Sequence, residues 1–208
     1  MPDRLLGILL FLPVPVVLGL FTRAPLGVGV SIGLGVLLMV THRLYARPFA
    51  LSRANRRCLW CGGSAGDGPL VPLQEPPGPT VWRACGEPHL ESLTRVFGTA
   101  FRWRWFLRAG ILGSLVLFLG AALLATFGRL GRLTFADTSA FFRLGVSLTV
   151  LPYGWLAAVR GPRTAGTIRV PFPVHLQALI GTNVMLWLFR IVGIVWIVQV
   201  ILFTASPS

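Results

Sequence analysis

Hydrophobic residues along the chain gather into five runs, separated by polar or turn-forming residues. These runs cover approximately residues 5–21, 26–41, 109–127, 141–159 and 176–203. An α-helix needs about 20 apolar residues to cross a hydrocarbon core of about 30 Å. The run at 109–127, which contains no charged residue, meets that requirement most clearly. The pattern predicts an all-α polytopic membrane protein with about five transmembrane helices.

The first two runs are the shortest for crossing a bilayer. Pro13 and Pro15 should kink or split the first run, because proline removes a backbone donor and clashes with the preceding turn. The turn at residues 22–25 favours a helical hairpin, and a re-entrant or partly interfacial pair stays open. The N-terminal run also has the composition of a secretion signal, but no small-residue cleavage site follows it. We therefore expect a retained helix.

Small residues recur along one side of the second run. Gly29 and Gly33 are four residues apart, and Ser31 with Gly35 repeats this spacing. Small residues at that interval allow two helix backbones to approach closely. Packing within the same bundle is the simpler interpretation, and a dimer interface is the alternative.

A long polar segment, residues 42–108, separates the second run from the third. It contains ten of the 19 arginines and all three cysteines. Residues 70–73 and 80–83 could form two short strands, and from His89 onward apolar residues recur at helical spacing. The segment closes on a basic and aromatic cluster typical of a membrane–water interface, formed by Arg102, Trp103, Arg104 and Trp105.

The runs and the polar segment together predict three regions. A transmembrane hairpin occupies residues 1–41, and a three-helix membrane region occupies residues 109–208. Between them, residues 42–108 form a small α+β insertion between the second and third helices. Residues 160–169, inside the last region, read as a basic loop.

The chain has a formal net charge of +13, and every basic residue other than histidine is an arginine. Such a charge would suit a nucleic-acid partner, but the arginines cluster at the ends of apolar runs, where arginines set topology and contact anionic lipid headgroups. The positive-inside rule places the N-terminus and the arginine-rich loop in the cytoplasm. We expect a bacterial inner-membrane protein that contacts the bilayer, anionic headgroups, and a protein partner or a second copy of itself. Nucleic acid is disfavoured.

The three cysteines and one histidine form two pairs with the spacing of metal ligands. Cys58 and Cys61 form a CxxC motif followed by glycine, and Cys85 precedes His89 by four residues. The turn of a CxxC motif aims both thiolates at one point, and Pro88 suits the first turn of a helix that would carry His89. We expect these four residues to hold a structural Zn²⁺ ion, because four protein ligands leave no open coordination position.

Two ligands from a knuckle, a short hairpin, and two ligands at a helix N-terminus resemble a treble-clef or zinc-ribbon module over residues 58–89. His42 is a further candidate for the fourth ligand. A disulfide is disfavoured in a reducing cytoplasm, and a redox CxxC motif would need βαβ surroundings. Haem attachment would need histidine at position 62, which is Gly62. An iron–sulfur centre, which usually takes four thiolates, stays open as an alternative.

The last run contains Asn183 and Arg190 on nearly the same helix face. They could line a polar site for an anionic headgroup, a quinone or a substrate, because polar residues inside a membrane are costly and often functional. The simpler interpretation is that Arg190 extends toward the headgroups while its stem stays in lipid. No carboxylate lies inside any run, which disfavours proton-coupled or cation-coupled transport.

These patterns favour a non-enzymatic membrane protein whose zinc-stapled loop contacts a partner, as an accessory or assembly subunit of a membrane complex. The first alternative is a transporter or membrane-embedded enzyme that uses Arg190 and Asn183, with both side chains facing the bundle interior. The second is membrane-tethered nucleic-acid binding. It predicts a basic face pointing away from the bilayer, formed by Arg53, Arg56, Arg57 and Arg83.

Overall fold

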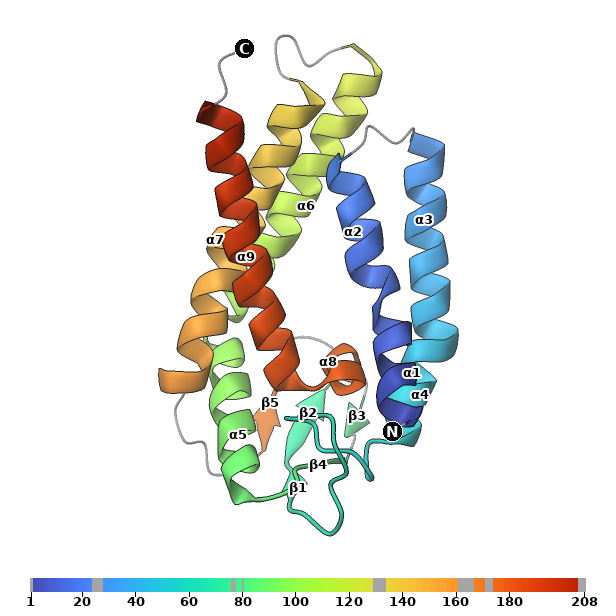
Figure 1. Cartoon of the computed structure of the whole chain (residues 1–208), viewed down its shortest axis with the longest axis vertical. Helices are drawn as coiled ribbons and strands as arrows, with labels where there is room; N and C mark the ends of the chain where they lie inside the picture. Colours follow the sequence, from blue (N-terminus) through green and yellow to red (C-terminus); the bar gives the residue numbers. More distant parts are fainter. Residues whose placement is uncertain are drawn as a thin grey trace.

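A computed structural model of the chain describes residues 2–23, 28–75, 78–79, 81–128, 134–160, 167–170 and 174–205. Long helices occupy one end of the molecule, and a region of short strands and loops occupies the other (Figure 1). Helix α1 begins beside that mixed region, whereas α9 ends at the far end of the long helices.

Three long helices form the main bundle: α6 (Arg104–Thr126), α7 (Phe135–Arg160) and α9 (Thr182–Ala205). Each contains a segment long and apolar enough to cross a membrane, which supports an integral membrane protein. Helix α7 packs against both α6 and α9. Of the five spans expected from the sequence, these three meet the length and composition of a span within the described residues.

Close helix contacts in this bundle are made at glycines. A Cβ atom added at Gly110 of α6 would overlap Thr149 of α7, and one added at Gly145 would overlap Ser114. One added at Gly193 of α9 would come within 3.0 Å of Leu151. Small residues therefore set the spacing between the three helices, as they do in membrane bundles generally.

The N-terminal run is interrupted next to its first proline, as expected. Helix α1 (Pro2–Phe11) and helix α2 (Pro13–Arg23) meet at Leu12. The Leu12 amide donates to the Ile8 carbonyl at 2.9 Å, so hydrogen bonding continues into the junction between the two helices. This pair lies beside α3 in Figure 1, where α2 contacts α3 and α1 contacts the π-helical turn that follows it.

Helix α3 (Val28–Thr41) runs on into a π-helical turn, η1 (His42–Ala46), and then into α4 (Arg47–Ser52). A Cβ atom added at Gly33 would meet no other described atom within 4 Å. The surroundings of Gly29 lie outside the described part of the chain. The simpler interpretation of the glycine spacing is that Gly33 packs closely against another helix of the same bundle. The described residues form no such contact with Gly33.

In the described residues, the mixed region contains five short strands. Strand β1 (Leu70–Val71) pairs antiparallel with β4 (Trp82–Arg83), and β2 (Leu73–Glu75) pairs antiparallel with β3 (Gly78–Pro79). The two segments expected as strands, residues 70–73 and 80–83, thus contribute to β1, β2 and β4, whereas β3 lies outside both. The fifth strand, β5 (Ile168–Arg169), pairs parallel with β2 and comes from the segment expected as a loop.

Helix α5 (Glu87–Arg102) covers these strands with the amphipathic face that its sequence predicts, burying Leu93 and Phe97. Trp82 of β4 and Leu59 lie in the same core. Leu179 joins this core from α8 (His175–Ile180). The last hydrophobic run is therefore divided: its first part packs on the mixed region and its second part is the long helix α9.

Candidate metal centre

The two ligand pairs predicted from the sequence come together in the mixed region. Cys58 and Cys61 lie on a turn after α4, Cys85 follows β4, and His89 lies in the first turn of α5. One ligand atom from each of the four lies within 4.8 Å of the others. The His89 Nδ1 atom is 3.6 Å from the Cys58 Sγ atom and 2.8 Å from the Cys85 Sγ atom.

These positions suit a tetrahedral metal ion. At the usual zinc bond lengths, sulfur and nitrogen ligands on a tetrahedron lie about 3.6 Å apart. The Cys58–His89 separation of 3.6 Å matches that edge, whereas the Cys85–His89 separation of 2.8 Å would lengthen by less than an ångström on binding. Thiolates with an imidazole are the donor set of closed structural sites. The four residues could therefore hold a metal ion.

His42, the further candidate ligand, lies elsewhere. Its Nε2 atom is 2.6 Å from the Nε2 atom of His175 at the start of α8. One imidazole can donate to the other only while at least one of them is neutral. Burial and the charge of Arg47 lower the pKa of His42. Burial, His42 and Arg47 lower the pKa of His175 to about 4, so this pair is neutral at physiological pH.

The turn that carries Cys58 and Cys61 is held by its own backbone. The Gly62 amide donates to the Cys58 carbonyl at 2.8 Å, and the Cys58 amide donates to the Gly63 carbonyl at 2.8 Å. The Gly63 amide also points at the Cys61 Sγ atom, 3.4 Å away. Gly62 has a φ of +69°, the left-handed conformation that glycine accepts without strain. The glycine after the CxxC motif is therefore required by the turn itself.

The pKa values of Cys58 and Cys85 are shifted in opposite directions. Burial acts to raise the pKa of Cys58, but hydrogen bonds from the backbone of Cys61, Cys85 and Trp60 outweigh it and lower that pKa. Burial, together with the hydrogen bond and negative charge of Cys58 and the charge of Cys61, raises the pKa of Cys85 to about 11. Adjacent thiolates repel one another, and a bound divalent cation reverses this by stabilising every deprotonated ligand.

The cysteine turn also contacts the start of α9, the last long helix. The Thr182 amide donates to the Leu59 carbonyl at 2.9 Å, and the Asn183 amide donates to the Trp60 carbonyl at 3.0 Å. The Thr182 hydroxyl also donates to the Leu59 carbonyl at 2.9 Å. The first amides of a helix have no partner inside it. The residues between the two cysteines therefore satisfy the N-terminus of α9.

Gly181 permits this contact. Its φ is +94°, and a Cβ atom added there would lie 2.9 Å from the Cys61 carbonyl carbon, the Gly62 nitrogen and the Trp60 oxygen. No side chain fits between the backbone at Gly181 and the cysteine turn. The turn between α8 and α9 is thus pressed directly onto the candidate metal centre.

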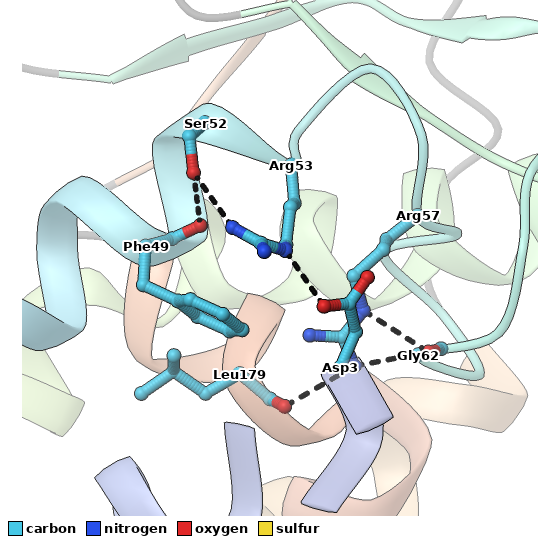
Figure 2. Close-up of polar contacts among 7 residues, drawn as sticks. All are labelled: Asp3, Phe49, Ser52, Arg53, Arg57, Gly62 and Leu179. Carbon is cyan, nitrogen blue, oxygen red and sulfur yellow. Dashed lines mark hydrogen bonds and ion pairs between the residues drawn. The ribbon is translucent and has the colours of Figure 1, made fainter. Parts of the chain in front are cut away.

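Arg57, the residue before Cys58, joins the cysteine turn to α8 (Figure 2). Only 8% of its surface is exposed. Its Nη2 atom donates to the Gly62 carbonyl at 3.0 Å and to the Leu179 carbonyl at 3.3 Å. Its Nη1 atom is buried without a hydrogen-bond partner among the described residues. Burial lowers the pKa of this guanidinium, although the charges of Asp3 and Cys61 oppose that effect.

Helix α1 also contacts the cysteine turn. The Arg4 Nη2 atom donates to the Cys61 carbonyl at 3.0 Å. Asp3 forms an ion pair of 3.0 Å with Arg53, which Figure 2 shows next to Arg57. A Cβ atom added at Gly7 would overlap the Leu179 carbonyl, so α1 and α8 also touch through their backbones.

The four arginines considered for nucleic acid do not share one open face. Arg57 is buried, Arg53 is paired with Asp3, and Arg83 donates to the Gly68 carbonyl at 2.9 Å. Arg56 is the exposed member of the set.

Asn183 and Arg190, the polar residues singled out in the last run, have different surroundings. Asn183 lies at the cysteine turn, whereas Arg190 lies two turns further along α9. The Arg190 Nε atom donates to the Gly154 carbonyl of α7 at 2.9 Å. A cavity of about 140 Å³ does lie between α7 and α9, beside Arg143 and Gln199, but Arg190 does not line it.

The interface cluster predicted at residues 102–105 spans the junction of α5 and α6. Arg102 and Trp105 are exposed, and Trp103 and Arg104 are half-buried. The Arg104 guanidinium lies 4.4 Å from the Phe101 ring centroid. These residues mark the point where the chain passes from the mixed region into the first long apolar helix.

Three residues of this site were not singled out by sequence reasoning, namely Arg4, Gly181 and Thr182, and Arg57 was considered only as part of a basic surface. Only the Gly181-Thr182 pair carries a local signal, because glycine often ends a helix and threonine often begins one. Comparisons of the chain with protein-family models, with curated proteins and with solved structures found no match.

Proposed function

We propose that Cys58, Cys61, Cys85 and His89 hold a structural Zn²⁺ ion, and that the protein is a non-enzymatic accessory or assembly subunit of a membrane complex. The observation that carries this proposal is the contact between the cysteine turn and the start of α9. An ion bound there would fix a membrane helix, rather than act on a substrate.

The donor set supports a structural role for the ion. Four protein ligands leave no coordination position for water or substrate. Binding of structural zinc contributes directly to folding, because the unfolded chain has no preformed site. The strands of the mixed region are only two or three residues long. A metal ion would therefore supply much of the cohesion that such short strands lack.

Charge also supports zinc at this position. A Zn²⁺ ion with three thiolates and a neutral imidazole carries a net charge of −1. Arg57 and Arg4, which donate to carbonyls of the same turn, place positive charge beside it. The buried guanidinium of Arg57 would then have a nearby anion, which a buried charge requires.

The orientation follows from the arginine distribution. The N-terminal helix and the mixed region lie at the same end of the molecule, as a cytoplasmic N-terminus and loop would require (Figure 1). We place that end in the cytoplasm of a bacterial cell, with the long helices in the inner membrane.

Surface exposure supports a partner in the membrane. Helix α3 exposes Val36, Leu37 and Met39, and its glycine at position 33 is open. An apolar helix face with room for close approach suits either lipid or another helix. The protein partner or second copy expected from the sequence would dock there.

Membranes solubilised in a mild detergent would test the accessory role by native electrophoresis and mass measurement. The wild-type chain should migrate in an assembly well above its own 22.6 kDa, and the Cys58→Ser variant should leave that assembly. A wild-type chain that migrates alone would refute the accessory role. An assembly that persists in Cys58→Ser would refute the dependence on the metal.

A further inference from the structure

Arg190 is held in a defined arrangement rather than lying free at the end of a flexible stem. Its guanidinium carbon lies 4.7 Å from the Trp187 ring centroid and 4.9 Å from the Trp155 ring centroid. Its Nε atom donates to the Gly154 carbonyl at 2.9 Å. The cation is thus fixed by one hydrogen bond and by the faces of two tryptophans, from α7 and α9.

This arrangement faces the surroundings of the bundle. Trp155 is 52% exposed and Trp187 is 51% exposed. Ile191 and Ile194, the next residues along this side of α9, are 54% and 47% exposed. An exposed surface of tryptophan and isoleucine on a membrane helix is a lipid-facing surface.

Arg190 lies in the half of the α9 membrane segment that is nearer the mixed region. Leu186, one turn before it, packs in one cluster with Leu107 and Tyr153. Leu107 lies three residues after the start of α6, next to the Arg104 and Trp105 interface residues. Arg190 is therefore about 12 Å from Thr182 along the helix, on the mixed-region side of the middle of this segment, and its long stem can carry the guanidinium toward the headgroups of that leaflet.

The donors of Arg190 are only partly used. A guanidinium has five N–H donors in a planar fork, and the described residues accept one hydrogen bond from it, through Nε. The outer edge of the fork suits two oxygens of a phosphate in a bidentate arrangement. A cation partly buried among indole rings also needs a compensating anion.

We propose that Arg190, Trp155 and Trp187 form a binding site for the phosphate of an anionic phospholipid in the leaflet on the side of the mixed region. The Nη groups donate to the phosphate oxygens, and the two indole rings pack against the glycerol and the upper acyl chains. Gly154 belongs to the site as well. A Cβ atom there would come within 3.3 Å of the Arg190 Cγ atom, so glycine leaves room for the arginine stem. None of these residues is a candidate metal ligand.

Native mass spectrometry of the full chain in mild detergent tests this site, with phosphatidylglycerol and phosphatidylcholine of identical acyl chains as probes. The wild-type protein should retain phosphatidylglycerol in preference to phosphatidylcholine. Arg190→Gln should reduce retention of phosphatidylglycerol by about tenfold, because charged hydrogen bonds are lost. Arg190→Lys should reduce it by a similar factor, because lysine keeps the charge but lacks the planar fork.

Arg108→Gln is the matched control, because Arg108 is another arginine beside an exposed tryptophan, with its guanidinium carbon 5.8 Å from the Trp105 ring centroid. It should change retention by less than about twofold. Equal losses in Arg108→Gln and Arg190→Gln would overturn the site, as would a wild-type protein without preference for phosphatidylglycerol. Displacement of the lipid by inorganic phosphate alone would assign the site to a soluble anion and overturn the lipid. If Arg190→Gln fails to fold, Trp187→Leu tests the site instead, because it keeps all charges. This variant should also lower the retention of phosphatidylglycerol.

Discussion

Two glycines of this protein lie in opposite surroundings. Gly181, between α8 and α9, has its Cα so close to the cysteine turn that a Cβ atom would lie 2.9 Å from three backbone atoms. Gly33, in α3, has no described atom within 4 Å of the same position. The sequence emphasised Gly33, because it belongs to a GxxxG pattern. Spacing alone therefore does not identify the glycine that a fold requires, whereas a left-handed φ next to a packed backbone does.

The comparison extends to the regions around these glycines. Residues 58–62 and residues 177–183 are joined by backbone hydrogen bonds and by the buried Arg57, and the four candidate metal ligands are clustered at the first of these segments. The face of α3 around Gly33 is apolar and exposed. We infer that the first region holds the protein together and that the second is available to lipid or to a partner.

Removal of one candidate metal ligand is expected to have the largest effect on the first region. His89→Ala should abolish tight metal binding and expose residues 58–89 and 175–183 to hydrogen exchange, because an incomplete ligand set cannot staple the turn. His42→Ala is the matched control, since His42 lies outside the cluster, and it should retain the metal. Metal loss in both variants would mean that the cluster is not the binding site.

Adding a methyl group to each glycine compares the two regions directly. Gly181→Ala should lower the free energy of unfolding by about 3 kcal/mol or more, because alanine disfavours a positive φ and the methyl group would overlap the cysteine turn. Gly33→Ala should leave stability unchanged or raise it by about 1 kcal/mol, since alanine is the better helix former. Thermal unfolding in detergent measures both. Similar losses in the two variants would show that α3 is packed as tightly as the α8–α9 turn.

Substitution of Arg57 tests whether a charged side chain, as well as a metal ion, joins the cysteine turn to α8. Arg57→Met should lower stability by about 2 kcal/mol, because it leaves the Gly62 and Leu179 carbonyls without a charged donor. Arg56→Met, at the exposed neighbouring position, should change stability by less than about 0.5 kcal/mol. Equal effects would mean that the buried guanidinium contributes nothing beyond a surface arginine.

The smallest expected effect is a pH dependence from the His42–His175 pair, which joins η1 to α8. Burial lowers the pKa of His175 to about 4 in the folded protein, below its ordinary value. The unfolded chain therefore binds protons first on acidification, so stability should fall between pH 6.5 and about 4. His175→Gln should flatten this part of a melting-temperature profile measured against pH. A profile identical to wild type would remove the pair as a source of acid sensitivity.

The success of the sequence-based predictions depends on how local each feature is. The ligand cluster could be predicted because Cys58 and Cys61 share one turn, and Cys85 and His89 share one helix start. The break at Leu12, next to Pro13, and the amphipathic face of α5 are equally local. The contact of Thr182 with Leu59 joins positions 123 residues apart, and no pattern in either segment reveals the other.

Arg57 illustrates a second limit. It was grouped with Arg53, Arg56 and Arg83 as a basic surface, since adjacent arginines look alike in a sequence. Its burial follows from the closing of α8 over the cysteine turn, which is a tertiary event. The same applies to β5, because a two-residue strand in a basic segment is stabilised only by the partner strand that it meets.

The most direct test of the central claim is the metal content of the detergent-purified protein, with wild type measured beside Cys58→Ser. Inductively coupled plasma mass spectrometry should find about one zinc per chain in the wild type, and less than about a tenth of that in Cys58→Ser. Iron in place of zinc would contradict the proposed ion, and zinc content unchanged by Cys58→Ser would contradict the assigned centre. Wild-type protein without bound metal would remove the staple on which the contact between the cysteine turn and α9 is proposed to depend.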